Sequence, residues 1–169
     1  MQTATITLST QHPLEIPGFD TALATHAQRV LAYENENLLE RIMDKEGLSE
    51  EAARILMRDM LQFLMIAGAF RGQPLAPTPT IDAAWHHFIL FTHDYAAFCQ
   101  DHFGRFIHHV PNTKSRLHLV GNGMLSRSIQ KAKEIFGPLS PNWTGRSADD
   151  PASCVSDCEK CNGHSNCQN

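Results

Sequence analysis

The chain of 169 residues has little of several features that define common classes of protein. No apolar run approaches the roughly 18 residues that a membrane-spanning helix needs. The formal net charge is −4 and the pI is about 6.2, which disfavours nucleic-acid binding through phosphate contacts. No basic residue precedes an apolar block in the first residues, so the pattern does not predict a secretory signal. We therefore expect a cytoplasmic protein with reduced thiols and with neither a membrane nor a nucleic acid as its partner.

Apolar residues recur at helical spacing over most of the chain. Helices are predicted over residues 19–47, about 50–70, about 81–103 and about 124–136. The second of these is apolar nearly all round from Ile55 to Phe70, which is typical of a central, buried helix. Ser49 and Thr80 are placed to cap the second and third helices. The expected fold is therefore all-α, a compact bundle of about four main helices.

The two ends of the chain differ in composition from the helical part. Residues 1–18 are predicted to form an extended N-terminal arm, and residues 19–139 the helical domain. Residues 140–169 form a cysteine-rich tail, in which Val155 is the only large apolar residue after Trp143. Such a segment cannot bury enough apolar surface to offset the entropy of ordering it. We expect this tail to be disordered unless a metal ion clips it.

A histidine cluster marks the third predicted helix and the residues after it. Seven of the ten histidines fall within residues 86–118. On the predicted helix 81–103, one carboxylate and two imidazoles share a face within roughly 40°, which makes a partial metal site. Two further imidazoles follow the predicted helix end at Gly104 and could close this site. The candidate ligands are Asp82, His86 and His93 on the helix, and His108 or His109 after it.

The same residues also have simpler explanations, which the sequence leaves open. Asp82 is equally explained as a carboxylate favoured in the first turn of a helix. His86 fits a histidine at the edge of the core that bonds to a carbonyl, and His93 an exposed helix position beside Asp94. His87 lies about 100° from His86 on a helix, so we expect it to be exposed.

Two kinds of enzyme are disfavoured. Cys99 lies late in the third predicted helix on its apolar stripe, not at a helix N-terminus where a thiolate would be stabilised. We therefore expect a buried, inert thiol and no cysteine hydrolase. A Walker-type glycine-rich loop is absent, and the short GNG at residues 121–123 does not replace one, so nucleotide-dependent chemistry is not expected.

The tail carries a second set of candidate metal ligands. Four thiols and one imidazole fall within fourteen residues, and their softness and number suit Zn²⁺ or Cu⁺. These candidates are Cys154, Cys158, Cys161, His164 and Cys167. Two alternatives stay open: a reduced, disordered tail, or the modified part of a peptide precursor for which the helical domain acts as leader.

An ordered string of residues in the histidine segment suggests a family. It comprises Asp82, Trp85-His86, Ile89-Leu90, Thr92, Tyr95, Phe98-Cys99, Phe103-Gly104, Phe106 and His108-His109-Val110-Pro111. Over roughly residues 45–112 the chain resembles the small bacterial members of the glycine-rich domain-containing protein-like family, which is largely uncharacterised. The glycine-rich region that names the family is absent. The resemblance implies that His87 and His93 are not family positions, and it shifts the candidate site toward Asp82, His86 and His108 or His109.

Two functions follow from these patterns. The first is a metal-binding helical protein that holds a divalent ion at the histidine cluster, the cysteine-rich tail or both, with zinc expected first and iron or copper as alternatives. An open position on such an ion would activate water or oxygen. The second is a non-enzymatic interaction or peptide-precursor protein, whose helical domain is a recognition module for a protein or peptide partner. The sequence assigns no reaction or substrate to either.

Overall fold

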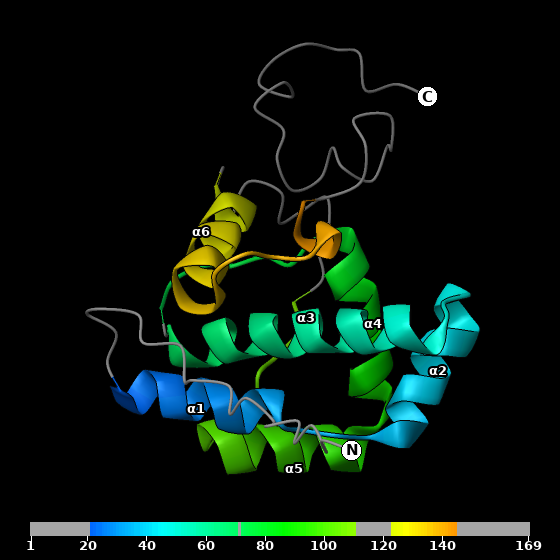
Figure 1. Cartoon of the computed structure of the whole chain (residues 1–169). Coiled ribbons are helices and arrows are strands. Elements are labelled where there is room, and N and C mark those ends of the chain that lie inside the picture. Colours follow the sequence, from blue (N-terminus) through cyan, green and yellow to red (C-terminus); the bar gives the residue numbers. More distant parts are fainter. Residues whose placement is uncertain (1–20, 71, 111–122, 145–169) are drawn as a thin grey trace, which may run out of the picture.

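The computed structural model describes residues 21–70, 72–110 and 123–144, and in these ranges it is all-helical, with no strands. The predicted all-α class is confirmed (Figure 1). The elements are α1 (Thr21–Leu31), α2 (Glu36–Glu46), α3 (Glu50–Ala69), α4 (Pro79–Leu90), α5 (Thr92–Phe103), α6 (Met124–Phe136) and a short 3-10 helix, η1 (Pro141–Trp143). None of the helices in these ranges is both long and apolar enough to cross a membrane. The predicted arm, residues 1–18, lies outside the described residues.

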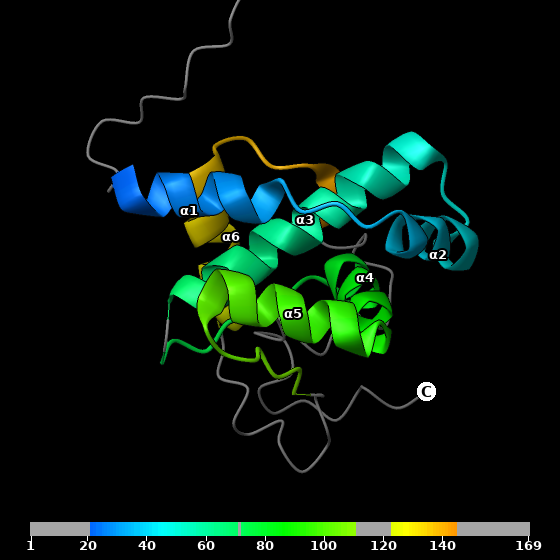
Figure 2. The ribbon, with the colours of Figure 1, turned by 90° about the horizontal axis from the view of Figure 1, so that it is seen from below.

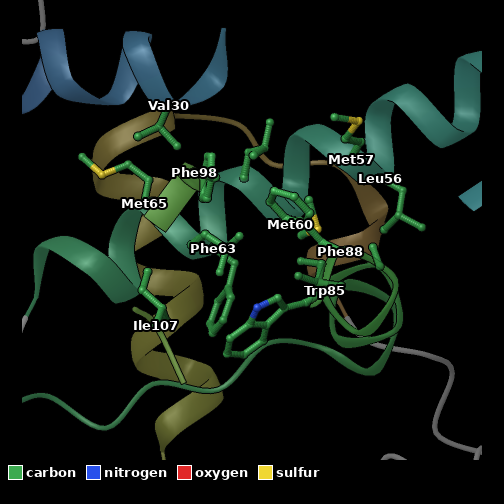
Figure 3. Close-up of a cluster of buried hydrophobic side chains, with 14 of the residues drawn as sticks. Val30, Leu56, Met57, Met60, Phe63, Met65, Trp85, Phe88, Phe98 and Ile107 are labelled. Atoms are coloured by element: carbon green, nitrogen blue, oxygen red, sulfur yellow. The ribbon is translucent and has the colours of Figure 1, made fainter. Parts of the chain in front are cut away.

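Helix α3 runs through the middle of the molecule (Figure 2). It packs against α1, α2, α4, α6 and η1, which explains why its sequence is apolar on nearly every face. Ser49 caps its N-terminus by accepting a hydrogen bond from the N–H of Ala52, as the sequence predicted. Phe63 of α3 lies next to Trp85 of α4 in the core, with ring centroids 5.4 Å apart (Figure 3). The central helix therefore supplies the surface on which α4, the main element of the candidate site, is fixed.

The prediction of one helix over residues 19–47 is wrong, because the structure has two helices there. The chain leaves the helical conformation after α1 and starts again at α2, whose N-cap is Asn35. The Asn35 side chain accepts from the N–H of Leu38 and donates to Asp94 on α5, at 2.8 Å. Its backbone is extended, with φ −154° and ψ 100°. The break follows from these contacts, because one side chain both caps α2 and ties it to a distant helix.

The prediction of one helix over residues 81–103 is also wrong. It divides into α4 and α5 at Phe91, whose φ of −83° and ψ of 66° are not helical. The N-cap of α4 is Thr78 rather than Thr80, and the Thr78 hydroxyl accepts from the N–H of Ile81. The two breaks turn four predicted helices into six among the described residues. The second break places His93 on α5, away from Asp82 and His86.

The C-terminal part of the described chain packs on α3. Helix α6 spans the residues predicted for it, 124–136. The following η1 lies in the segment that the sequence assigned to the tail, yet Trp143 is fully buried. Packing therefore continues to the end of the described range at Thr144, and the rest of the predicted tail lies outside it.

Candidate metal site

Three of the predicted ligands meet beside the N-terminal half of α4. Asp82 lies in the first turn of this helix, His86 one turn later, and His109 on the extended segment that follows α5. Nε2 of His109 lies 2.8 Å from Oδ1 of Asp82, and Nδ1 of His86 lies 3.4 Å from Oδ2. One donor atom from each residue lies within 4.8 Å of the others. Among the described residues, this is the only group of three or more acidic, histidine or cysteine side chains with such spacing.

The three side chains differ in exposure. The side chain of His109 is 14 % exposed, that of Asp82 34 % and that of His86 54 %. The His109 ring contacts Trp85 on one side and His86 on another, with centroid distances of 4.5 and 4.2 Å. The site is therefore closed by aromatic packing on the side of His109 and open to solvent on the side of His86.

The main chain of α4 fixes the tautomer of His86. Nδ1 of His86 lies 2.7 Å from the carbonyl oxygen of Asp82, one turn earlier. A carbonyl oxygen only accepts, so Nδ1 carries the proton and Nε2 keeps its lone pair when the ring is neutral. A hydrogen bond from one ring nitrogen to a main-chain carbonyl is a usual arrangement around metal-ligating histidines.

The segment with His109 is positioned by the residues that precede it. Gly104 ends α5 in the left-handed conformation, with φ 63°, and turns the chain back. The guanidinium of Arg105 then donates to the carbonyl oxygens of Ala67 and Gly68 at the end of α3. Two residues before His109, the carbonyl oxygen of Ile107 accepts a hydrogen bond from the hydroxyl of Tyr95. Burial raises the pKa of this hydroxyl well above its usual range, so it remains a donor at neutral pH.

The remaining histidines of the segment lie elsewhere. His93 is exposed on α5, because the helix breaks at Phe91, so the predicted face of Asp82, His86 and His93 does not form. His108 is also exposed and its ring contacts Phe106 rather than Asp82. The expectation that His87 is exposed is wrong: its side chain is 14 % exposed, and its Nε2 lies 2.7 Å from a carboxylate oxygen of Glu46 on α2.

Cys99 is a core residue. Its side chain is fully buried on α5, and burial raises the pKa of the thiol above its usual range. A thiol that resists ionisation is a poor nucleophile, in agreement with the expectation from its place on the apolar stripe.

The tail ligands cannot be placed beside this cluster. Cys154, Cys158, Cys161, His164 and Cys167 all lie outside the described residues.

Sequence reasoning missed a buried polar cluster. The Asp59 carboxylate on α3 is 3 % exposed and accepts hydrogen bonds from the side chains of Ser140, Asn142 and Trp143. The available signal was an acidic residue interrupting the apolar run of α3, with a late tryptophan in an otherwise polar segment. A buried carboxylate needs hydrogen-bond donors, and residues 140–143, within the predicted tail, supply them.

Comparison with known proteins gives a family but no relative with an activity. No curated protein and no solved structure matches the chain. A family model described as UCP032817-like, for an uncharacterised family, matches residues 26–131. This match overturns the suggested resemblance to the glycine-rich domain-containing protein-like family, which rested on one short string of residues. It covers most of the described chain, from α1 into α6, and includes Asp82, His86 and His109, so the chain belongs to the UCP032817-like family.

Proposed function

We propose that this protein binds a divalent transition-metal ion through Asp82, His86 and His109. The observation that carries the proposal is the convergence of two imidazoles and a carboxylate, from segments separated by a whole helix, within 4.8 Å. Two histidines and one carboxylate form a set that zinc and non-haem iron both accept. Zinc is the ion expected first, with iron and copper as alternatives.

The residues present fit such an ion. Ligand atoms around one tetrahedral zinc lie roughly 3.3 Å apart, so the three groups need to approach one another on binding. The Nδ1 bond of His86 to a carbonyl leaves Nε2 as the donor atom of that ring. Three protein ligands leave a position for water, and the half-exposed His86 places it toward solvent. A metal bound in this way would lower the pKa of that water.

The test separates the cluster from the tail in the full chain. A tail-serine variant (C154S, C158S, C161S and C167S) removes every tail thiol. It is purified metal-free under reducing conditions, loaded with Zn²⁺, Fe²⁺ or Cu²⁺, and analysed by elemental mass spectrometry. We expect about one equivalent per chain to be retained and competition between the ions to identify the preferred one. In this background His109→Ala and His86→Ala should abolish retention, because two remaining ligands hold an ion poorly.

His108→Ala and His93→Ala are the matched controls. Both remove an exposed imidazole that does not belong to the cluster, one of them next to His109 in the chain, and both should retain the ion. Equal loss from His108→Ala and His109→Ala would contradict the assignment. If Asp82 and His109 do no more than form a hydrogen bond with each other, the tail-serine variant will retain no ion at all.

The cysteine-rich tail is proposed as a second, separate site for Zn²⁺ or Cu⁺. The support is the spacing Cys154-x3-Cys158-x2-Cys161-x2-His164-x2-Cys167. Native protein should therefore retain one equivalent more than the tail-serine variant. Metal in the native protein alone would make the tail the sole binder. No metal in either form, with five titratable thiols in the native protein, would favour an interaction or peptide-precursor protein instead.

A further inference from the structure

A tyrosine hydroxyl joins α4 to the segment that carries His109. The indole Nε1 of Trp85 lies 2.9 Å from the hydroxyl of Tyr95, which lies 2.6 Å from the carbonyl oxygen of Ile107. An indole N–H only donates and a carbonyl only accepts, so the hydroxyl must accept from Trp85 and donate to Ile107. All three residues are buried. This Trp85–Tyr95–Ile107 relay has one direction only, and water does not compete for its bonds.

Both ends of the relay lie beside the candidate metal site. Trp85 lies between Asp82 and His86 in the chain. Its ring contacts the ring of His109, at a centroid distance of 4.5 Å. Ile107 lies two residues before His109, on a segment that belongs to no helix or strand. No regular hydrogen-bond ladder holds that segment, so its position depends on a few side-chain bonds. The bond from Tyr95 reaches the main chain two residues before His109, on the side of the core.

We infer that Tyr95 is a positioning residue, whose hydroxyl holds the main chain at Ile107 so that His109 reaches Asp82 and the metal. This inference rests on the proposed function. Without the hydroxyl, the Ile107 carbonyl and the Trp85 indole each lose a buried partner, and the segment shifts to satisfy them. The ligand His109 then spends less time at the geometry that an ion requires. Groups that orient metal ligands commonly change metal affinity about 10- to 100-fold when they are lost.

Tyr95→Phe tests the inference, and Tyr33→Phe is its matched control. Tyr33 is the other tyrosine of the chain, its ring packs on Phe88 and Phe98 in the same core, and its hydroxyl accepts only from Asn35. In the tail-serine background, we expect Tyr95→Phe to weaken Zn²⁺ binding about tenfold in competition with a chelator. Tyr33→Phe should stay within about twofold. Equal affinity of Tyr95→Phe and the parent protein would overturn the inference, and so would an equal loss in both variants.

A second readout needs no metal. The imidazole resonances of His109, assigned by comparison with His109→Ala, should shift in metal-free Tyr95→Phe and stay in place in Tyr33→Phe. If the parent protein binds no ion, the proposed function fails, and these resonances alone decide whether Tyr95 positions His109. If Tyr95→Phe does not fold, the parent protein supplies the second measurement: the Tyr95 hydroxyl proton, bonded to the Ile107 carbonyl in the core, should exchange slowly with solvent and be observable by NMR. A hydroxyl proton that exchanges too fast to be observed would overturn the inference.

Discussion

Gly68 lacks a side chain at the point where the ring of Phe103 lies against α3. A Cβ atom built on Gly68 would overlap two ring carbons of Phe103 and lie 2.9 Å from its Cγ. Phe103 is the last residue of α5, and Arg105, just after it, donates to the carbonyl oxygen of Gly68. One small residue thus lets α5 end close to α3, where the segment that carries His109 begins.

Gly68→Ala should therefore lower the free energy of unfolding, although alanine is the better helix former. Alanine in place of a helical glycine gains about 1 kcal/mol, whereas overpacking a rigid ring costs about 1–3 kcal/mol. The overlap with Phe103 involves ring atoms of a nearly buried side chain, which places the cost in the upper part of this range, so we expect a net loss of about 1–2 kcal/mol in urea unfolding. The added substitution Phe103→Leu should recover part of it. A Gly68→Ala protein more stable than the parent would show that the ring moves aside freely.

At the scale of elements, the periodicity of the sequence gives the helical faces but not the helix ends. Apolar residues continue at helical spacing across both breaks, so no local signal separates α1 from α2 or α4 from α5. The first break depends on the bond from Asn35 to Asp94, two residues that are 59 positions apart in the chain. Helices α3 and α6 were predictable because glycine or serine caps and polar flanks bound a single apolar pattern.

The candidate site was predictable only where it is local. Asp82 and His86 are four residues apart, so helical geometry alone brings them to one face. The prediction that His93 shares this face is wrong, because it needs a straight helix through Phe91, where the helix breaks. His109 could not be separated from His108 by sequence, since the choice depends on how Tyr95 and Arg105 set the extended segment.

The contact of α1 with α5 contains two histidines with buried, unpartnered nitrogen atoms. Nε2 of His26 and Nδ1 of His102 have no hydrogen-bond partner. The pKa of His102 is held below its usual range by burial, then by the positive charge of Arg29 and by His26, while Asp101 acts in the opposite direction. The folded protein therefore prefers this imidazole neutral.

This preference makes the stability of the fold depend on pH in a defined direction. His102 has a lower pKa folded than unfolded, so its contribution is fully present above the ordinary value of 6.5 and is lost as the pH falls through the folded pKa. We expect the melting temperature to decline from pH 7 toward pH 5, and the decline to be shallower in His102→Gln. His93→Gln, which changes an exposed imidazole of the same helix, should keep the slope of the parent protein. Identical slopes in all three proteins would exclude His102 as a cause.

At the scale of the whole molecule, one buried carboxylate fastens the last described segment to the centre. Asp59 of α3 accepts from Ser140 at 2.5 Å, from Asn142 at 2.8 Å and from the Trp143 indole at 3.2 Å. The Thr78 hydroxyl donates to the carbonyl oxygen of Asn142, and Thr78 is the N-cap of the helix that carries Asp82. The Asp59 cluster consists of Asp59, Thr78, Ser140, Asn142 and Trp143. It joins α3 to the start of α4 and to η1.

Asp59→Ala should release this segment, because the side chains of Ser140, Asn142 and Trp143 then lose their common acceptor. Leaving a buried donor without its partner costs about 1–3 kcal/mol, so a fall of at least this order in the free energy of urea unfolding is expected. Asp44→Ala is the control, since Asp44 is exposed and forms only a surface ion pair with Lys45, which is worth less than about 1 kcal/mol.

The fluorescence of Trp143 shows whether Asp59→Ala releases η1 from α3. The chain has two tryptophans, so in a Trp85→Phe background the emission comes from Trp143 alone, which is fully buried in the intact protein. Asp59→Ala should shift this emission to longer wavelength below the unfolding transition, because the indole reaches water once η1 leaves α3. A loss of stability without any shift would mean that the cluster stabilises the core while hydrophobic packing alone keeps Trp143 in place. An unchanged stability and an unchanged emission together would show that Asp59 does not hold η1 against α3.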